Sequence, residues 1–209
     1  MSTRILIATS NLGKLRDFAA AARPHGIAVA PLPDFASISP VVEDGLTFEA
    51  NACKKAEAYS CYAPDEIVLA DDSGLEVDTL DGAPGVHSAR YAADVPQEAG
   101  GNTDDEANNA KLIAALRGVP FGKRTGRFVC VIAAARDGNM LATFRGTADG
   151  VILDDLRGSN GFGYDPLFYF PEIQKTFAEL SAEEKARYSH RGSAFRQFLN
   201  WYKNGPGRN

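Results

Sequence analysis

The chain has 209 residues, which is enough for one globular domain or two closely joined lobes around a substantial hydrophobic core. The hydrophobic share of 44% and the charged share of 23% are ordinary values for a soluble protein. A net charge of -5 argues against a broad basic face for duplex nucleic acid, so any polyanion should be small and held by a few local cations.

The cysteines and the apolar runs indicate the cellular compartment of the protein. Cys53, Cys61 and Cys130 are odd in number and form no C-x-x-C pair, so we expect neither a disulfide framework nor a zinc knuckle. The apolar run at residues 128–135 is too short to span a bilayer, and the N-terminus lacks a signal-peptide core. We therefore expect a cytoplasmic protein with no membrane partner and no nucleic-acid partner.

Residues 4–8 predict a strand, and the T-S-N side chains at residues 9–11 offer N-caps to a helix that runs to Arg23. A helix N-terminus presents free N–H groups and partial positive charge, so this turn is a candidate phosphate seat with Lys14 as the counter-charge. The Walker pattern G-x-x-x-x-G-K-[ST] is absent, and an ordinary capped helix with a solvated lysine is the alternative.

A second strand is expected at residues 27–32 and a second helix at about residues 47–58. Lys54 and Lys55 are assigned to the solvated side of that helix. Glu43 lies just before it and is either a loop acid or a metal ligand, and its position alone does not decide between them.

The apolar run at residues 67–70 predicts a short buried strand that stops at Asp71 and Asp72. In an open α/β sheet, ligands bind beyond the carboxyl ends of strands, so a carboxylate pair there would meet a cation or polarise a water. The alternative is a D-S-G turn with two solvated acids.

The second half of the chain predicts a helix followed by a β-hairpin. Thr103 and Glu106 make a capping box for the helix. The apolar strand at residues 128–135 leads through a tight turn at 136–139 into residues 141–144, which indicates an antiparallel pair. A mixed sheet flanked by helices is therefore expected.

Residues 158–166 are dense in glycine and aromatic side chains. Glycine lets the backbone approach a ligand closely, and Phe162 or Tyr164 offers a face on which a planar base could stack. A glycine-rich turn whose aromatic rings pack into the core is the alternative.

A capping box at residues 181–184 opens a short helix that carries Lys185. The S-H-R-G run at residues 189–192 interrupts this helix, and a last helix follows. The tail at residues 204–209 is expected to fray.

Six motifs follow one another in a characteristic order: S-N-x-x-K, E-x-G-x-T-F with N-A, A-D-D-S-G-L, G-A-P-G-V-x-S-A-R-Y, G-F-G-Y-D-P and S-H-R-G. In this order the sequence resembles the inosine triphosphate pyrophosphatase family from Ile5 to about Trp201. The resemblance implies an α/β fold with an elongated mixed β-sheet flanked by helices, and two lobes with an active-site cleft between them. It also implies a single nucleoside triphosphate pyrophosphatase domain over residues 1–209 and a homodimer.

The same resemblance implies hydrolysis of ITP, dITP and XTP to the nucleoside monophosphate and pyrophosphate, with Mg²⁺ as cofactor. Asp72 would be the catalytic proton acceptor, and Asp72 and Glu43 would hold the metal. The residues implied for substrate binding are Thr9, Ser10, Asn11, Leu12, Gly13, Lys14, Ser73, Phe162, Gly163, Tyr164, Asp165, Lys185, His190 and Arg191.

Selection of a 6-oxo purine would depend on stacking against Phe162 and on donors to O6, such as backbone N–H groups, His190 or Arg191. Guanine also carries O6, so its rejection must come from the 2-position of the purine. Two other functions stay open: a related pyrophosphatase for modified pyrimidine triphosphates, and a non-enzymatic nucleotide-binding module. Asp71 and Asp72 argue against the module, because a binder of an anion gains nothing from apposed carboxylates without a bridging metal.

One position departs from the family pattern. The family commonly shows F-x-E-N-A, whereas residues 48–52 read F-E-A-N-A, with Ala50 in place of the glutamate. Ala50 lies three residues after Thr47, so the glutamate could have closed a capping box, and its loss would cost about 1 kcal/mol. If it served the metal instead, Glu49 or water must compensate.

Overall fold

The structure, a computed structural model, describes residues 4–93 and 104–205. Its seven strands form one open sheet in the order β2-β1-β3-β4-β5-β6-β7. This confirms the mixed α/β sheet flanked by helices. The strands are β1 (Arg4–Ile7), β2 (Ala28–Pro31), β3 (Val68–Val77), β4 (Thr125–Arg136), β5 (Asn139–Ile152), β6 (Phe168–Phe170) and β7 (Lys175–Thr176). The helices are α1 (Leu12–Ala22), α2 (Phe48–Ser60), α3 (Asp105–Ala115), α4 (Ala182–Tyr188) and α5 (His190–Asn204).

Strand directions follow from the connections. β1 pairs in parallel with β2 and with β3, and parallel neighbours need crossovers, which α1 and α2 provide. β4 and β5 are adjacent in the sheet and joined only by Asp137 and Gly138, with φ of 51° and 76°. Two positive φ values match the twist of a hairpin, which confirms the predicted antiparallel pair. β5–β6 and β6–β7 are antiparallel as well.

The chain forms two compact units. The first comprises Met1–Asp72, Cys130–Thr147 and Ala182–Asn209, and the second comprises Ser73–Val129 and Ala148–Ser181. The long strands β3, β4 and β5 each contribute residues to both units.

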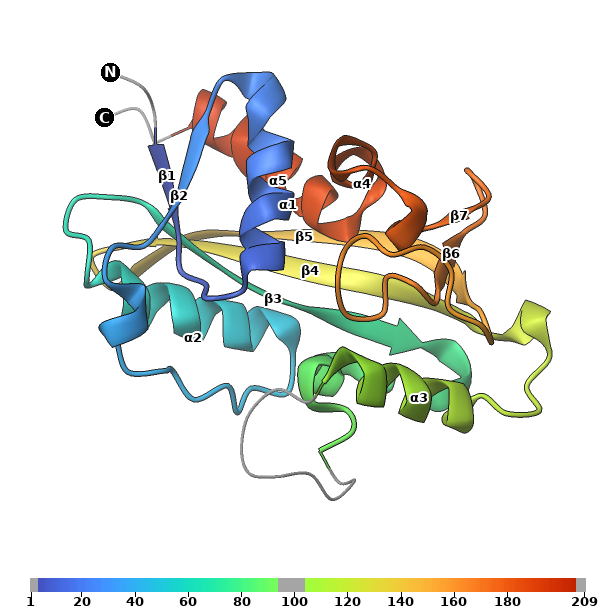
Figure 1. Ribbon diagram of the computed structural model, residues 1–209. Helices are drawn as coiled ribbons and strands as arrows, with labels where there is room; N and C mark the ends of the chain where they lie inside the picture. The colour runs from blue at the N-terminus through green and yellow to red at the C-terminus, as the bar shows by residue number, and fades with distance from the viewer. Residues whose placement is uncertain (1–3, 94–103, 206–209) are drawn as a thin grey trace. The chain divides into compact units, whose positions relative to one another are not determined.

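In the first unit, β3 separates two packed layers. α1, α4 and α5 lie on one face of the strands and α2 on the other (Figure 1). Leu69 packs with Ile7, Phe18 and Phe195 in the core under α1 and α5. Because side chains alternate along a strand, residues 68, 70 and 72 must face the α2 layer instead.

The second unit has an aromatic core. The ring centroids of Phe128 and Phe168 lie 4.6 Å apart, and those of Phe168 and Phe177 lie 4.9 Å apart. Phe170 packs on the same cluster, with its centroid 6.0 Å from that of Phe177. Among the described residues of both units, no helix combines the length and the apolar character needed to cross a membrane.

The ends of β3 and α3 are the element ends that bear on the sequence expectations. The predicted end of the central strand at Asp71 is wrong, because β3 continues to Val77. Thr103 lies outside the described residues, and the observed cap of α3 is Asp104, whose side chain accepts a hydrogen bond from the N–H of Glu106. Of the tail, residues 206–209 also lie outside the described part.

Candidate active site

The start of α1 is built as the sequence predicts. The Asn11 side chain accepts a hydrogen bond from the Lys14 N–H at 3.0 Å, and Thr9 Oγ1 accepts from the Asn11 N–H at 3.2 Å. The Lys14 side chain is not solvated: its Nζ lies 2.9 Å from Asp71 Oδ2 and the side chain is only 17% exposed. Of the neighbouring residues implied for substrate binding, Leu12 is 72% exposed and Gly13 is buried.

Asp71 and Asp72 do not face each other, which corrects the expectation of an apposed carboxylate pair. They are consecutive residues inside β3, so their side chains point to opposite faces. Asp71 meets Lys14 and, at 3.8 Å, Nε of Arg191. Asp72 instead accepts hydrogen bonds from Asn51 Nδ2 at 3.1 Å and from Lys55 Nζ at 3.3 Å. Asp71 therefore pairs with Lys14 and Arg191, whereas Asp72 pairs with Lys55.

The pKa values of the two acids shift in opposite directions. Burial alone would raise the pKa of Asp71, but Lys14, Arg191 and Lys55 outweigh it and lower the pKa to about 2. Burial raises the pKa of Asp72 above its ordinary value, and the charge of Glu43 adds to this rise, while Lys55 and Lys14 oppose it. A carboxylate with a raised pKa accepts a proton more readily than its neighbour, so Asp72 is the better base.

Lys55 contacts both Glu43 and Asp72, and these three residues form the Asp72 group. The Nζ of Lys55 lies 2.7 Å from Glu43 Oε2 as well as 3.3 Å from Asp72 Oδ1. The residue is only 8% exposed, so its assignment to the solvated side of the helix is wrong. Helical spacing could have shown this, because position 55 shares a face with the buried Phe48, Ala52 and Tyr59.

Asp17 is a second residue that the sequence did not reveal. Its Oδ2 lies 2.7 Å from Arg191 Nη1 and 3.4 Å from Lys185 Nζ. Lys185 and Arg191 are 4% and 2% exposed. Asp17 therefore holds two of the predicted phosphate-binding cations, which come from different helices, against α1.

The S-H-R-G run is the junction of α4 and α5. Ser189 caps α5 by accepting a hydrogen bond from the Gly192 N–H at 3.1 Å. A side chain at Gly192 would overlap the Ala186 carbonyl, so the close helix junction requires glycine. Burial, followed by the charges of Arg191, Lys185 and Lys14, holds the pKa of His190 well below its usual range. His190 is therefore a neutral imidazole at pH 7.

The glycine-rich loop belongs to the second unit. Tyr164 is buried, and its hydroxyl donates to the Ser88 carbonyl at 2.8 Å. The packed-aromatic alternative is thus correct for Tyr164, whereas Phe162 is only half-buried and stays a stacking candidate. Asp165 is buried and accepts a hydrogen bond from the Phe162 N–H at 2.9 Å. Ser73 is half-buried within β3.

The donor set around Lys55 fits a hard divalent cation. Glu43 and Asp72 are both carboxylates and already share one ammonium group, so the site attracts positive charge. Across residues 4–93 and 104–205, no cluster of three or more His, Cys, Asp or Glu side chains could enclose a metal. Two carboxylates with substrate phosphates and waters are the typical ligands of Mg²⁺.

The alanine at position 50 leaves the helix start intact. Thr47 Oγ1 still accepts a hydrogen bond from the Ala50 N–H at 3.1 Å. Glu49 Oε1 accepts a hydrogen bond from Thr143 Oγ1 at 3.0 Å, so Glu49 is engaged away from Glu43 and Asp72. The cap is made without the family's glutamate, and Glu49 does not replace that residue at the Asp72 group.

Replacing Asp71 by asparagine should lower the free energy of unfolding by about 2–3 kcal/mol, because the buried cations lose the counter-charge that lowers the pKa of Asp71. The folded pKa is lowered, so this contribution is complete above the ordinary value of 3.8 and is lost as the pH falls toward about 2. Urea denaturation should therefore show a gap between the unfolding free energies of wild type and Asp71→Asn at pH 7, and this gap should narrow in acid. A gap of less than about 0.5 kcal/mol at pH 7 would contradict this account.

The sequence profile of the Ham1 family matches residues 5–201, nearly the whole chain. The chain belongs to the Ham1 family. Its Ham1 relatives include the dITP/XTP pyrophosphatase of Desulforamulus reducens, which is 50% identical over 196 residues covering 94% of each chain. The dITP/XTP pyrophosphatase of Acidobacterium capsulatum is 49% identical over 200 residues, 95% of this chain and 98% of the relative.

Solved Ham1 structures confirm the fold. The Staphylococcus aureus Ham1 protein matches with a TM-score of 0.79 and 40% identity, covering 96% of this chain and 98% of that one. A HAM1 protein from Coxiella burnetii matches with a TM-score of 0.80 and 36% identity, covering 97% and 100%. The family resemblance seen in the six sequence motifs is therefore confirmed.

Proposed function

We propose that this Ham1 protein hydrolyses dITP, ITP and XTP to the nucleoside monophosphate and pyrophosphate, and so removes nonstandard purines from the nucleotide pool. The observation that carries the proposal is Asp72, a buried carboxylate that shares the Lys55 ammonium with Glu43. Two relatives that are 50% and 49% identical to this chain are named dITP/XTP pyrophosphatases, which supports the same reaction.

Asp72 is assigned the role of the general base that accepts a proton from the attacking water. Its raised pKa suits a base, and the Asn51 amide and the Lys55 ammonium fix its orientation. The water attacks the α-phosphorus, pyrophosphate leaves, and the proton goes to Asp72. Positioning and charge neutralisation are the main demands of such a displacement.

Lys14, Lys185 and Arg191 are assigned to the phosphates, together with the α1 N-terminus from Thr9 to Gly13. Each of the three cations is held by a carboxylate, Asp71 or Asp17, so its position is fixed before substrate arrives. Preorganised charges stabilise a transition state more than mobile ones because they need no rearrangement.

The cofactor proposed is Mg²⁺, with Glu43 and Asp72 as its protein ligands. Bound there, it would offset the charge on the phosphate oxygens and lower the pKa of a coordinated water. The oxygen-only donor set supports this choice over softer metals.

Base selection is assigned to Ser73 and to the loop of Phe162, Gly163, Tyr164 and Asp165, in which Tyr164 acts by anchoring the loop to Ser88, with His190 as a further candidate. The half-buried Phe162 ring offers a stacking face. Arg191 is assigned to the phosphates, so of the two side chains expected to read O6 the neutral His190 is the better candidate.

We also propose that residues 1–209 act as one catalytic domain and that the protein is a cytoplasmic homodimer. The Ham1 profile takes in both units, which supports one domain. The free cysteines at positions 53, 61 and 130 agree with a reducing compartment. Size-exclusion chromatography with light scattering tests the dimer, and a monomer mass at micromolar concentration would contradict it.

The test of function is a panel of triphosphates with Mg²⁺ and product identification by chromatography. Fast turnover of dITP and XTP to monophosphate and pyrophosphate, with slow turnover of ATP and GTP, is the expected result. Preference for a modified pyrimidine triphosphate would support the second function considered from the sequence. Binding without turnover would support a nucleotide-binding module.

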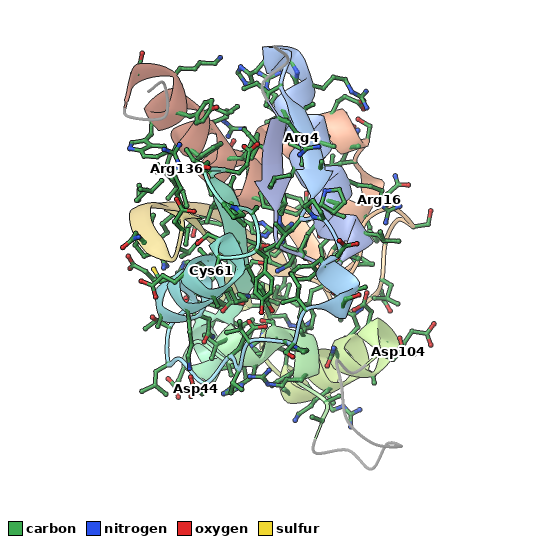
Figure 2. The ribbon with its side chains drawn as sticks, turned by 90° about the vertical axis from the view of Figure 1, so that its left-hand side faces the viewer. Arg4, Arg16, Asp44, Cys61, Asp104 and Arg136 are labelled. Carbon is green, nitrogen blue, oxygen red and sulfur yellow. The ribbon has the colours of Figure 1, made fainter. Side chains whose placement is uncertain are left out.

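Lys14→Ala should raise KM for dITP by about 10- to 100-fold, the equivalent of losing one charge-assisted hydrogen bond. Arg16→Ala is the matched control: Arg16 lies on the same helix, is exposed, and projects outward (Figure 2). Steady-state kinetics of the two variants checks the prediction. Equal KM and kcat in both would show that Lys14 only pairs with Asp71 and binds no phosphate.

A further inference from the structure

Helix α3 supplies no residue to the chemistry assigned above, yet its side chains hold the backbone of Gly163 on both sides. The Gly163 N–H donates to Asp105 Oδ2 at 2.6 Å, and the Gly163 carbonyl accepts from Asn109 Nδ2 at 3.0 Å. Asp105 and Asn109 are four residues apart, so they share one face of α3. The two side chains together hold both peptide groups that flank the Gly163 Cα, in the loop that carries Phe162.

The same helix also holds the G-A-P-G-V-H-S-A-R-Y segment. Asn108 Oδ1 accepts a hydrogen bond from the Ala92 N–H at 2.9 Å, and Lys111 Nζ donates to the Tyr91 carbonyl at 2.7 Å. The Tyr164 hydroxyl links the two segments directly through Ser88. Four side chains of α3 therefore contact the backbone of two family motifs or, at Ala92, of the residue directly after one of them.

The loop depends on such outside support because its own backbone is permissive. Gly161 and Gly163 have φ of 78° and 61°, a region that glycine visits freely. A side chain at Gly161 would overlap the Asp165 carboxylate, so glycine is required there. Flexible residues flank Phe162 on both sides, and contacts from elsewhere must define where its ring points.

The contact of Asn109 has a cost. Asn109 is 5% exposed, and within the described part of the chain its Oδ1 has no hydrogen-bond partner. Leaving a buried acceptor unsatisfied is unfavourable. The amide nonetheless donates to Gly163, so this orientation serves the loop at the expense of the side chain's own hydrogen bonding.

The loop amides also change how the base can be recognised. The Phe162 N–H is engaged by Asp165 and the Gly163 N–H by Asp105. These two backbone donors are thus occupied by carboxylates of this chain, rather than directed at a purine O6. The contribution of this loop to base selection then lies in the fixed placement of the Phe162 ring.

We infer that Asp105 and Asn109 are positioning residues for base selection, which act by holding Gly163 and with it the Phe162 ring. The inference rests on the proposed function. A ring that is fixed in advance loses less conformational entropy on binding. Loss of the clamp, the two hydrogen bonds of Asp105 and Asn109 to Gly163, should therefore weaken base binding and base discrimination while leaving the phosphate chemistry intact.

The experiment compares Asp105→Ala, Asn109→Ala and Asp105→Asn with wild type, using Glu106→Ala as the control on the same helix. Both alanine variants should raise KM for dITP about fivefold to tenfold with kcat within about twofold, the effect of one lost hydrogen bond. The kcat/KM ratio of dITP to dGTP should fall by a similar factor. Asp105→Asn keeps an acceptor for the Gly163 N–H and should restore both values.

Calorimetric titration with dIMP and dGMP gives a second readout that needs no turnover. Weaker dIMP binding by both alanine variants, with recovery in Asp105→Asn, supports the clamp. Wild-type dIMP affinity and wild-type base selectivity in both variants, even with lowered melting temperatures, would show a purely structural role and overturn the inference. Failure of the wild type to hydrolyse any triphosphate would instead overturn the proposed function, and the dIMP titration would still decide on the clamp.

Discussion

Asp72→Asn should lower kcat for dITP by about 10³-fold while the protein stays folded, because the variant loses the general base and a metal ligand together. Asparagine has the same shape as aspartate, and its Oδ1 can still accept a hydrogen bond from Lys55. Lys55 also keeps its contact with Glu43. Single-turnover kinetics at saturating dITP and Mg²⁺ measures the loss, and circular dichroism verifies the fold.

The matched control for this variant is Asp149→Asn. Asp149 has a side chain that is 78% exposed and pairs with Arg127, so its kcat should equal that of wild type. A folded Asp72→Asn enzyme that turns over within tenfold of wild type would remove Asp72 from the mechanism.

Lys55→Met should lower the free energy of unfolding by about 3–5 kcal/mol, because it leaves the buried Asp72 carboxylate without its cation. Methionine preserves most of the side-chain volume, so the loss comes from charge rather than from a cavity. Any folded fraction should also be impaired in hydrolysis, since the shared cation no longer orients Asp72 and Glu43. Urea denaturation with and without Mg²⁺ measures the stability.

Lys54→Met provides the comparison at the adjacent position. Lys54 is 46% exposed and pairs with the exposed Asp44, so its replacement should change stability by less than about 0.5 kcal/mol. In Figure 2, Asp44 is labelled at the outside of the ribbon. Equal stability losses in the two lysine variants would show that the contact of Lys55 with Asp72 and Glu43 contributes nothing specific.

Elements with local signals were predictable from the sequence. The N-cap of α1 at Asn11 and that of α2 at Thr47 use side chains that accept hydrogen bonds from amides of the first turn. The β4–β5 turn was predictable for a similar reason, because Asp137 and Gly138 tolerate positive φ. All three depend on residues that are close together in the sequence.

The central strand shows where local reasoning fails. The sequence predicts that the strand stops at Asp71, since charged residues are costly inside a sheet. The cations that offset this cost, Lys14, Lys55 and Arg191, come from three helices far apart in the sequence. Their approach is a tertiary property, so the continuation of β3 to Val77 was not predictable from the run of residues alone.

The burial of Lys55 could have been anticipated from its helical spacing, but its partners could not. Position 55 falls on the apolar face of α2, whereas its carboxylates come from the preceding loop and from β3. Asp17 is similar: its neighbour Phe18 marks a buried face of α1, but Lys185 and Arg191 lie more than 160 residues away.

Hydrolysis of dITP in water enriched in oxygen-18 shows which phosphorus atom the water attacks. If the water activated by Asp72 attacks the α-phosphorus, the label should appear in dIMP and none should enter pyrophosphate. Mass spectrometry of the separated products distinguishes the two. Label in pyrophosphate, or release of dIDP and orthophosphate, would contradict the account.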